Sequence, residues 1–350
     1  MVNGRSVERM QNEAVPILSV REMKMHLRSS DGVVRAVDGV SFDVRPGETL
    51  GLVGESGSGK SITALSIMGL IPKDNISDFS GAVLFDGEDL ARKSAREMRA
   101  IRGRRVAMIF QEPMTSLNPV MRVGAQISEA LVHHEGLGAR AANREAEELL
   151  HRVGIPSPKA RVREFPHQLS GGMRQRAMIA MAIACRPRLL IADEPTTALD
   201  VTIQAQILQL IDDLKRELDM GVLLITHNFG VVAQTADRTA VMYAGRIVEK
   251  APTTALFEAP MHPYTRGLLR AMPRLGARAE GAHDRLQEIP GIVPRLSEVR
   301  RYCSFAPRCD QRFEPCFEDQ PATTSAGSDH SVRCYARQES ASGWKMEAPT

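Results

Sequence analysis

The strongest constraint on the fold of this chain is a glycine-rich run at residues 54–61, which follows an apolar run at 49–53 and precedes a helix-like stretch at 62–69. In this setting the run predicts a phosphate-binding loop between a strand and a helix. Glycines allow successive backbone N–H groups and the helix N-terminus to point at phosphates. A plain flexible glycine turn is the alternative, and the flanking segments argue against it. The predicted loop consists of Gly54, Glu55, Ser56, Gly57, Ser58, Gly59, Lys60 and Ser61.

The last two residues of this loop carry its chemistry. Lys60 would reach the β and γ groups of a nucleoside triphosphate, and the Ser61 hydroxyl would ligate Mg²⁺. We therefore expect ATP and Mg²⁺ as the cofactors of this chain.

Short apolar runs alternate with helical patterns from residue 17 to about 250, which is typical of an α/β unit with a central sheet. Residues 121–166 are rich in Ala, Glu, Arg and Leu and predict helices inserted into the sheet-forming core. After residue 250 the chain becomes rich in Pro and Arg and contains cysteines, which predicts a separate, smaller appendage. The expected strands are 49–53, 106–110, 189–192, 222–226 and 239–243.

The amino-acid composition disfavours some classes of function. The aromatic content of 4% and the formal charge of +3 do not favour a dedicated nucleic-acid binder, so no nucleic acid is expected as a partner. The longest apolar stretches fall short of the roughly 18 residues that cross a bilayer. The first sixteen residues contain no apolar core of a secretory signal. These features predict a protein of the cytosol or of the cytosolic face of a membrane.

Two acids follow the predicted strand at 189–192. Asp193 suits a Mg²⁺ ligand, and Glu194 could polarise the water that attacks a γ-phosphate. An acidic pair after a strand is also an ordinary start of a loop, and the phosphate loop upstream favours the functional interpretation.

A Ser-Gly-Gly sequence starts another helical stretch. Ser170, Gly171 and Gly172 would present bare N–H groups and the positive end of a helix dipole to a phosphate. A helix N-cap followed by glycines explains these residues equally well.

With these motifs in this order, the chain resembles the ATPases of ABC transporters. The resemblance implies a P-loop ABC ATPase core, a mixed sheet flanked by helices, with an inserted helical subdomain and a small Pro/Cys-rich C-terminal appendage. It also implies that Gln111 contacts Mg²⁺ and the attacking water, that His227 lies near the γ-phosphate, and that Asp200 belongs to the nucleotide site. Such ATPases close head-to-tail in pairs, so a second ATPase subunit, identical or related, is implied. The aromatic residue on which adenine commonly stacks is missing, and Val34 or a neighbour stands there.

Several segments are similar to the dipeptide/oligopeptide permease ATPases in particular, namely residues 111–119, 259–265, 289–294 and 303–309, together with Met173. This resemblance implies ATP-driven peptide import, with two transmembrane permease subunits and an extracytoplasmic solute-binding protein as partners. It places the chain at the cytoplasmic face of the inner membrane. Nickel chelates or glutathione-like cargo are alternatives. A soluble ABC ATPase acting on nucleic acid or the ribosome is another, although the second cassette or coiled-coil arm usual in such proteins is missing.

The resemblance also divides the chain. It implies a nucleotide-binding domain at 17–258, with the helical subdomain at about 112–175, and an oligopeptide-transporter-type domain at 259–338. The ends, 1–16 and 339–350, have the composition of disordered termini.

The C-terminal appendage contains a cluster of cysteines, Cys303, Cys309, Cys316 and Cys334, with five, six and seventeen residues between them. Zinc sites usually pair ligands at shorter spacing, and disulfides are improbable in a reducing compartment. Four thiolates can hold a [4Fe–4S] cluster, and the matching segment of the peptide-permease branch carries one in some members. We expect such a cluster, with zinc and free structural thiols as alternatives. Cys185 is expected in the core.

Overall fold

Two β-sheets organise the part of the chain that the computed structural model describes, residues 15–30, 32–112, 116–197, 199–272, 289–297, 301–327 and 329–338. One sheet has four strands in the order β2-β1-β4-β5, and the other has eight in the order β11-β12-β10-β9-β3-β8-β7-β6. The strands are β1 Leu18–Ser29, β2 Gly32–Val44, β3 Thr49–Val53, β4 Ile76–Phe85, β5 Glu88–Asp89, β6 Val106–Ile109, β7 Leu189–Asp193, β8 Gly221–Thr226, β9 Arg238–Tyr243, β10 Arg246–Pro252, β11 Thr324–Ser325 and β12 Ser331–Val332. The helices are α1 Lys60–Ile67, α2 Ala95–Ile101, α4 Val123–Glu135, α5 Ala139–Arg152, α6 Pro158–Arg161, α7 Gly171–Ile183, α8 Val201–Leu218, α9 Phe229–Thr235, α10 Thr253–Glu258 and α11 Pro263–Arg270.

The centre of the larger sheet is parallel. Strands β6, β7, β8, β3 and β9 run in one direction, whereas β10 and β12 are antiparallel to their neighbours. Every residue of β3, β7, β8 and β9 is buried, as expected of strands covered on both faces. These strands are the apolar runs predicted from the sequence, with ends shifted by a residue. The mixed sheet flanked by helices confirms the predicted α/β fold class.

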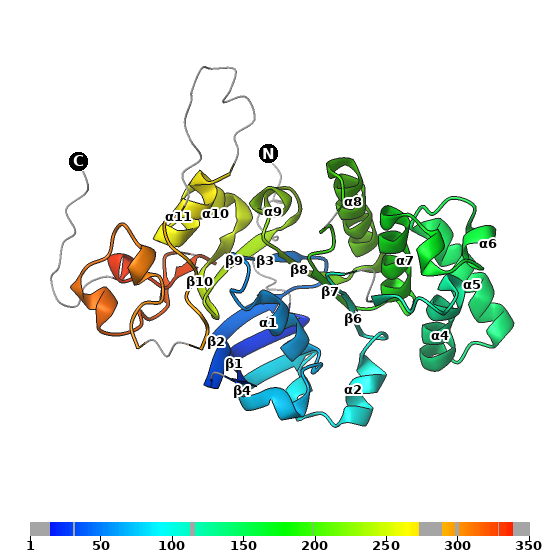
Figure 1. Cartoon of the computed structure of the whole chain (residues 1–350), viewed down its shortest axis with the longest axis horizontal. Coiled ribbons are helices and arrows are strands. Elements are labelled where there is room, and N and C mark those ends of the chain that lie inside the picture. The colour runs from blue at the N-terminus through cyan, green and yellow to red at the C-terminus, as the bar shows by residue number, and fades with distance from the viewer. Residues whose placement is uncertain are drawn as a thin grey trace, which may run out of the picture.

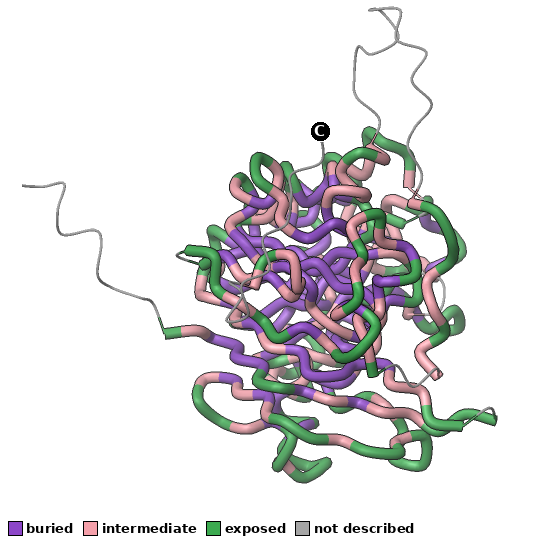
Figure 2. Tube along the Cα trace, turned by 90° about the vertical axis from the view of Figure 1, so that its left-hand side faces the viewer, coloured by how far each residue is buried: buried purple, intermediate pink, exposed green. Residues whose placement is uncertain are grey.

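Each face of the parallel sheet has its own cover. Leu189 and Ile191 of β7 point into a core shared with α1 and the antiparallel sheet, while Leu190 and Ala192 point into a core shared with α7 and α8. Figure 1 shows α1 between the two sheets and α7 and α8 beyond the other face. In Figure 2 the buried residues occupy the interior of these layers. Because side chains alternate between the two faces of a strand, the strand that ends at Asp193 contributes to both cores.

The inserted helices lie at one end of the molecule. Helices α4, α5 and α6 fall within the segment 121–166 that composition marks as helical, and they lie at the right of Figure 1. Their apolar residues, such as Ile127 and Leu150, join the same buried core as α7 and α8. The boundaries of the subdomain, about 112–175, stay a prediction.

The C-terminal segment, which its change in composition predicts to be a smaller appendage, pairs with the main sheet, and its predicted bounds, 259–338, stay a prediction. Strand β12 pairs with β10, with Glu249 opposite Val332, so the segment extends the main sheet. Its Tyr264 and Phe305 share a buried cluster with Val53 of β3 and Tyr243 of β9. The disorder predicted for 1–16 and 339–350 concerns ends that lie outside the described residues, apart from residues 15 and 16.

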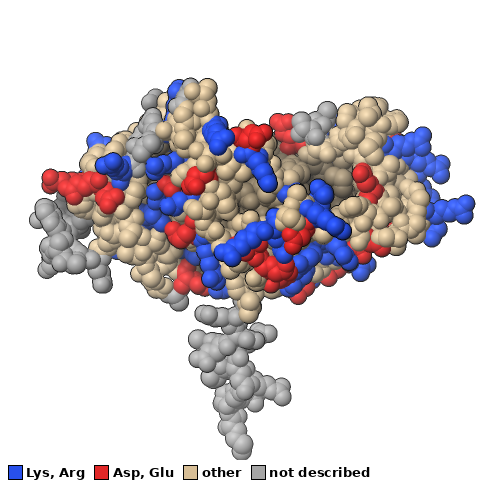
Figure 3. Space-filling view, turned by 90° about the horizontal axis from the view of Figure 1, so that it is seen from below, with Lys and Arg blue, Asp and Glu red and all other residues tan. Residues whose placement is uncertain are grey.

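The surface carries both signs of charge. On the face shown in Figure 3, Lys and Arg side chains are interspersed with Asp and Glu. Across the described ranges, none of the helices combines the length and apolar character that crossing a membrane requires.

Candidate functional site

The parallel strands bring the predicted residues to one edge of the sheet. Strands β3, β6, β7 and β8 are neighbours in register, so the segments that follow them emerge side by side. These segments carry the phosphate loop (residues 54–61), Gln111, Glu194 and His227. Ligands of α/β proteins bind at this carboxyl edge, because the chain leaves the sheet there.

The shape of the phosphate loop requires glycine. Gly54 has φ +153° and Gly59 has φ +105°. A Cβ on Gly54 would lie 2.1 Å from the Met242 carbonyl oxygen, and one on Gly59 would lie 2.3 Å from the Ala36 carbonyl oxygen. The loop is therefore pressed against the backbones of β9 and β2. Helix α1 begins within the loop at Lys60, with Gly59 as N-cap and no capping hydrogen bond from a side chain.

Lys60 places a positive charge inside the loop. Its side chain is buried, and its Nζ donates hydrogen bonds to the Gly54 carbonyl at 2.8 Å and to the Glu55 carbonyl at 2.9 Å. Burial lowers the pKa of Lys60, while Glu194, Asp193 and Glu55 raise it and so counter part of that effect. The loop carbonyls hold the Lys60 ammonium inside the loop, where its positive charge can attract an anion that enters the same loop.

Asp193 is joined to the loop through Ser61. As the last residue of β7 it is 4% exposed, and its Oδ1 accepts a hydrogen bond from the Ser61 hydroxyl at 3.1 Å. Burial raises the pKa of Asp193, and the hydrogen bond from Ser61 lowers it. A hydroxyl and a carboxylate oxygen at hydrogen-bond distance are ligands that Mg²⁺ prefers, so these residues fit the predicted Mg²⁺ site.

Glu194 is held by three side chains. Its Oε2 accepts hydrogen bonds from Gln111 Nε2 at 3.1 Å and from the Thr197 hydroxyl at 2.9 Å. Its Oε1 lies 3.0 Å from His227 Nδ1. Burial alone would raise the pKa of Glu194, but the hydrogen bonds with His227 and Thr197 outweigh it and lower the pKa. Its backbone turns away from the strand with φ +47°, which separates its carboxylate from that of Asp193.

The structure thus brings Gln111, Glu194 and His227 together and adds Thr197, and the catalytic roles of these residues stay predictions. Thr197 lies three residues after Glu194, and this spacing alone did not mark it as a partner of the carboxylate. The turn that brings the two side chains together is visible only in the structure. The segment 113–115 after Gln111 lies outside the described residues.

The Ser-Gly-Gly residues lie elsewhere. Ser170 is the N-cap of α7, and its hydroxyl accepts a hydrogen bond from the Met173 N–H at 3.3 Å. A Cβ on Gly172 would lie 3.1 Å from Ile203 of α8. Asp200 caps α8 by accepting a hydrogen bond from the Ile203 N–H at 2.9 Å. Among the hydrogen bonds of the described residues, none joins these residues to the phosphate loop.

Two residues of the C-terminal region that sequence reasoning missed reach the phosphate loop. Arg308 pairs with the Glu55 carboxylate at 2.7 and 3.1 Å, and the Tyr264 hydroxyl accepts a hydrogen bond from the Glu55 N–H at 3.0 Å. Arg308 stood within the segment 303–309 noted for its cysteines, and no local pattern marks an arginine as buried. On β2, Val34 is half-buried, and no contact identifies it as an adenine platform.

The cysteines of the predicted cluster, Cys303, Cys309, Cys316 and Cys334, all belong to the C-terminal region. One backbone bond joins two of them, since the Cys303 N–H donates to the Cys316 carbonyl at 3.1 Å. Burial raises the pKa of Cys309 to about 12 and of Cys334 to about 11. All four are free thiols, as is buried Cys185. Within the described ranges no group of three or more His, Cys, Asp or Glu side chains is placed to hold a metal ion. The predicted [4Fe–4S] cluster and the zinc alternative therefore lack support among the described residues.

Comparisons with known proteins agree with this geometry. The family model "ABC transporter" matches residues 37–197, and the model "Oligopeptide/dipeptide transporter, C-terminal region" matches residues 248–316. A probable peptide ABC transporter ATP-binding protein of Sinorhizobium fredii is 52% identical over 92% of this chain and 96% of its own length. The dipeptide transport ATP-binding protein DppD of Bacillus subtilis is 49% identical over 93% of this chain and 96% of its own length.

A solved structure has the same core. It is a dimeric ATP-binding cassette in a post-hydrolysis state with ADP and Pi bound, which matches with a TM-score of 0.61 and 25% identity. The match covers 67% of this chain and 98% of that one. With the phosphate loop, the carboxylates and the matched C-terminal region, this chain belongs to the ABC transporter family, as an ATP-binding subunit with the C-terminal region of the oligopeptide/dipeptide transporters.

Proposed function

We propose that this chain hydrolyses ATP to power the import of di- and oligopeptides, acting at the cytoplasmic face of the cell membrane. The observation that carries the proposal is the position of Glu194. It follows Asp193, which is bonded to Ser61 of the phosphate loop, and its own carboxylate is held by Gln111, Thr197 and His227. A carboxylate fixed beside a phosphate-binding loop is what activation of a water molecule requires.

Each residue has a role in this reaction. The loop N–H groups and Lys60 bind the phosphates. Ser61, Asp193 and Gln111 would hold Mg²⁺ through their oxygen atoms, and the ion would neutralise charge on the phosphates. Glu194 orients the water and accepts its proton as the water oxygen bonds to the γ-phosphorus. The bond from that phosphorus to the bridging oxygen breaks, which releases ADP and phosphate. The lowered pKa of Glu194 keeps it ionised and able to act as a base at neutral pH.

A second ATPase subunit completes the site. Ser170 and Asp200 are the N-caps of α7 and α8, and Gly171 and Gly172 are the first two residues of α7. We assign them to the partner's nucleotide, because bare N–H groups at a helix start stabilise phosphate charge. The dimeric form of the related cassette with ADP and Pi supports this arrangement.

The test is Glu194→Gln, with Glu148→Gln on α5 as a surface control. Glu194→Gln should keep ATP binding, lower kcat by at least about 100-fold, and accumulate as an ATP-dependent dimer in light scattering. Glu148→Gln should hydrolyse ATP at the wild-type rate. Normal hydrolysis by Glu194→Gln would disprove the role of this carboxylate.

The peptide cargo rests on the relatives. DppD and the oligopeptide transport ATP-binding protein OppD of Bacillus subtilis, 48% identical over 95% of this chain, are named for dipeptide and oligopeptide transport. Two transmembrane permease subunits and an extracytoplasmic solute-binding protein complete the proposed transporter. Uptake of a labelled tripeptide by cells with and without this chain tests the cargo. Uptake of a nickel chelate or of glutathione instead would reassign the cargo and leave the ATPase proposal intact.

The iron–sulfur hypothesis has a direct test of its own. It rests on the sequence alone, in which Cys303, Cys309, Cys316 and Cys334 lie within a 32-residue span. Absorption near 400 nm with bound iron in an anaerobic preparation, lost in Cys309→Ser, would establish it, and a colourless preparation without iron would end it.

A further inference from the structure

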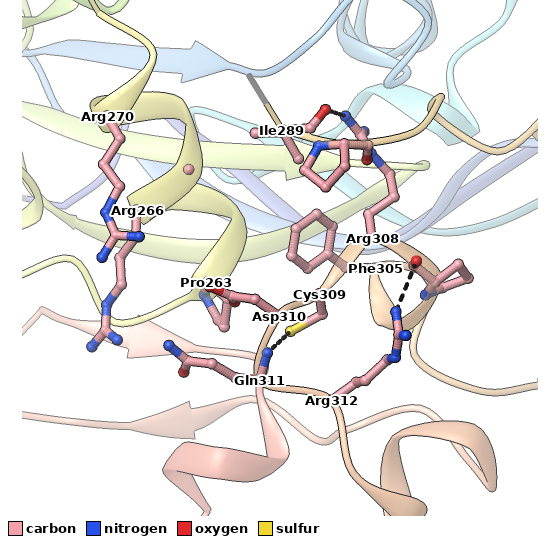
Figure 4. Close-up of a pocket in the computed structure, with 13 residues that line it drawn as sticks. Pro263, Arg266, Arg270, Ile289, Phe305, Arg308, Cys309, Asp310, Gln311 and Arg312 are labelled. Carbon is pink, nitrogen blue, oxygen red and sulfur yellow. Dashed lines mark hydrogen bonds between the residues drawn. The ribbon is translucent and has the colours of Figure 1, made fainter. Parts of the chain in front are cut away.

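Arg308 is buried between the C-terminal region and the nucleotide loop. It ends the 3₁₀ turn Ala306–Arg308, and its side chain is 4% exposed. It lies at the wall of a cavity of about 530 Å³. Figure 4 shows its guanidinium turned toward Ile289, while Arg312, lower in the view, bonds to the Pro307 carbonyl. The two neighbouring arginines therefore have different partners.

Every N–H of the Arg308 guanidinium has an acceptor. Nε donates to the Pro290 carbonyl at 3.0 Å, and Nη2 donates to the Ile289 carbonyl at 3.3 Å as well as to Glu55. Nη1 donates to Glu55 at 2.7 Å and lies 3.5 Å from the Tyr243 hydroxyl. A bidentate pair whose remaining donors are also satisfied has one defined geometry. Arg308 thus fixes the Glu55 carboxylate in space.

Glu55 passes this constraint into the phosphate loop. Its N–H donates to the hydroxyl of fully buried Tyr264 at 3.0 Å, and its carbonyl accepts from Lys60 Nζ at 2.9 Å. The carboxylate, the N–H and the carbonyl of one residue thereby link Arg308 and Tyr264 to the lysine that meets the phosphates. Direct hydrogen bonds thus connect the C-terminal region to the ATP site without a break.

The charge of Glu55 adds a second effect. A carboxylate on a loop that binds a triphosphate repels the ligand unless a cation neutralises it. Arg308 provides that cation in a bidentate contact, and no other Lys or Arg forms a salt bridge with Glu55 among the described residues. Loss of Arg308 would leave a negative charge beside the phosphates and would also free the loop backbone.

We propose that Arg308 is a positioning residue for ATP, which sets the nucleotide affinity of the phosphate loop through Glu55. The inference rests on the proposed function, since it requires that residues 54–61 bind ATP. It makes the C-terminal region part of the nucleotide site and not only an attachment to the cassette.

The experiment is a double-mutant cycle on the full-length chain, read by fluorescent ATP binding and by the KM and kcat of hydrolysis. Arg308→Met should weaken ATP binding about tenfold, the value of one charge-assisted hydrogen bond of about 1.4 kcal/mol. It should raise KM with kcat within about twofold, because Gln111, Glu194 and His227 do not contact it. Glu55→Gln in the Arg308→Met background should restore most of the affinity, since the repelling charge is removed. Arg312→Met, the exposed neighbour, should bind ATP like the wild type.

The outcomes separate this inference from the proposed function. Failure of the wild-type chain to bind ATP would refute the proposed function itself. Wild-type binding with unchanged affinity in Arg308→Met, or a double mutant no better than Arg308→Met, would overturn the inference alone. If Arg308→Met does not fold, Arg308→Lys keeps the charge without the bidentate contact and should show a smaller loss of affinity that Glu55→Gln again reduces. A loss that Glu55→Gln does not change would assign Arg308 a purely structural role.

Discussion

Replacing Gly59 with alanine should damage the phosphate loop far more than replacing Gly57, although both glycines have positive φ. The φ angles are +105° for Gly59 and +77° for Gly57. A Cβ on Gly59 would lie 2.3 Å from the Ala36 carbonyl oxygen and 2.8 Å from Met242 Cε, whereas one on Gly57 would meet nothing within 4 Å. Both alanines would share the cost of positive φ, and only one would collide with its surroundings.

The two costs can be estimated separately. An alanine held at positive φ loses about 1–2 kcal/mol. Overpacking in a close-packed interior adds about 1–3 kcal/mol, and the atom that Gly59→Ala meets belongs to the backbone of β2, which cannot rotate away. We therefore expect losses of about 1–2 kcal/mol for Gly57→Ala and about 2–5 kcal/mol for Gly59→Ala.

Thermal unfolding with and without Mg²⁺ and ATP measures both effects. Gly59→Ala should unfold at a lower temperature than Gly57→Ala and should lose the rise in Tm that ATP gives the wild type, because a distorted loop no longer binds the ligand. Gly87→Ala is the matched control, since Gly87 has φ +81° and open space around it. It should show the conformational cost and retain the full ATP effect. Equal midpoints for the Gly57 and Gly59 variants would refute the steric reasoning.

Two further predictions concern the carboxylates. Thr197→Val removes one hydrogen bond that lowers the pKa of Glu194, so that pKa should rise and the acid limb of the kcat–pH profile should move to higher pH by up to about one unit. Because the hydrogen bond from Thr197 lowers the pKa of Glu194, its removal should not lower that pKa further. An acid limb that moves to lower pH or stays in place would therefore contradict this assignment. Glu48→Gln breaks a buried pair with Arg238 at 3.1 Å and should cost about 3–5 kcal/mol in denaturant unfolding. Asp213→Asn, in an exposed pair at 3.9 Å, should cost less than about 1 kcal/mol, and equal losses would show that burial does not decide the effect.

The strands and the carboxyl edge could be predicted because their signals are local. A strand covered on both faces is apolar along most of its length, as residues 189–192 and 222–225 are. Register then places the residues at the end of each strand at one edge of the sheet, so Asp193 could be placed there from the sequence, whereas the role of His227 came from the resemblance to the ABC ATPases. The loop glycines could be recognised because they lie between an apolar run and a helix-like stretch.

The attachment of the C-terminal region could not be predicted because nothing local encodes it. Strands β11 and β12 have two residues each, too short for any alternation to appear. The cysteines are close in sequence, but spacing along the chain does not fix where their side chains point, and no metal site results among the described residues. Arg308 and Glu55 lie 253 residues apart, and either one alone has the pattern of a surface charge.

These long-range contacts restrain the conformation of the phosphate loop. Met242 and Ala36 hold its backbone on one side, the Gly245 N–H donates to the Ser58 carbonyl at 2.8 Å, and Tyr264 and Arg308 hold Glu55. A loop restrained by so many partners pays for its shape during folding and not during binding, which favours affinity. The restraints come from β2, from β9, from the turn before β10 and from the C-terminal region. A substitution in any of these four parts should therefore alter ATP affinity before it alters kcat, since none of the restraining residues forms a hydrogen bond with Glu194.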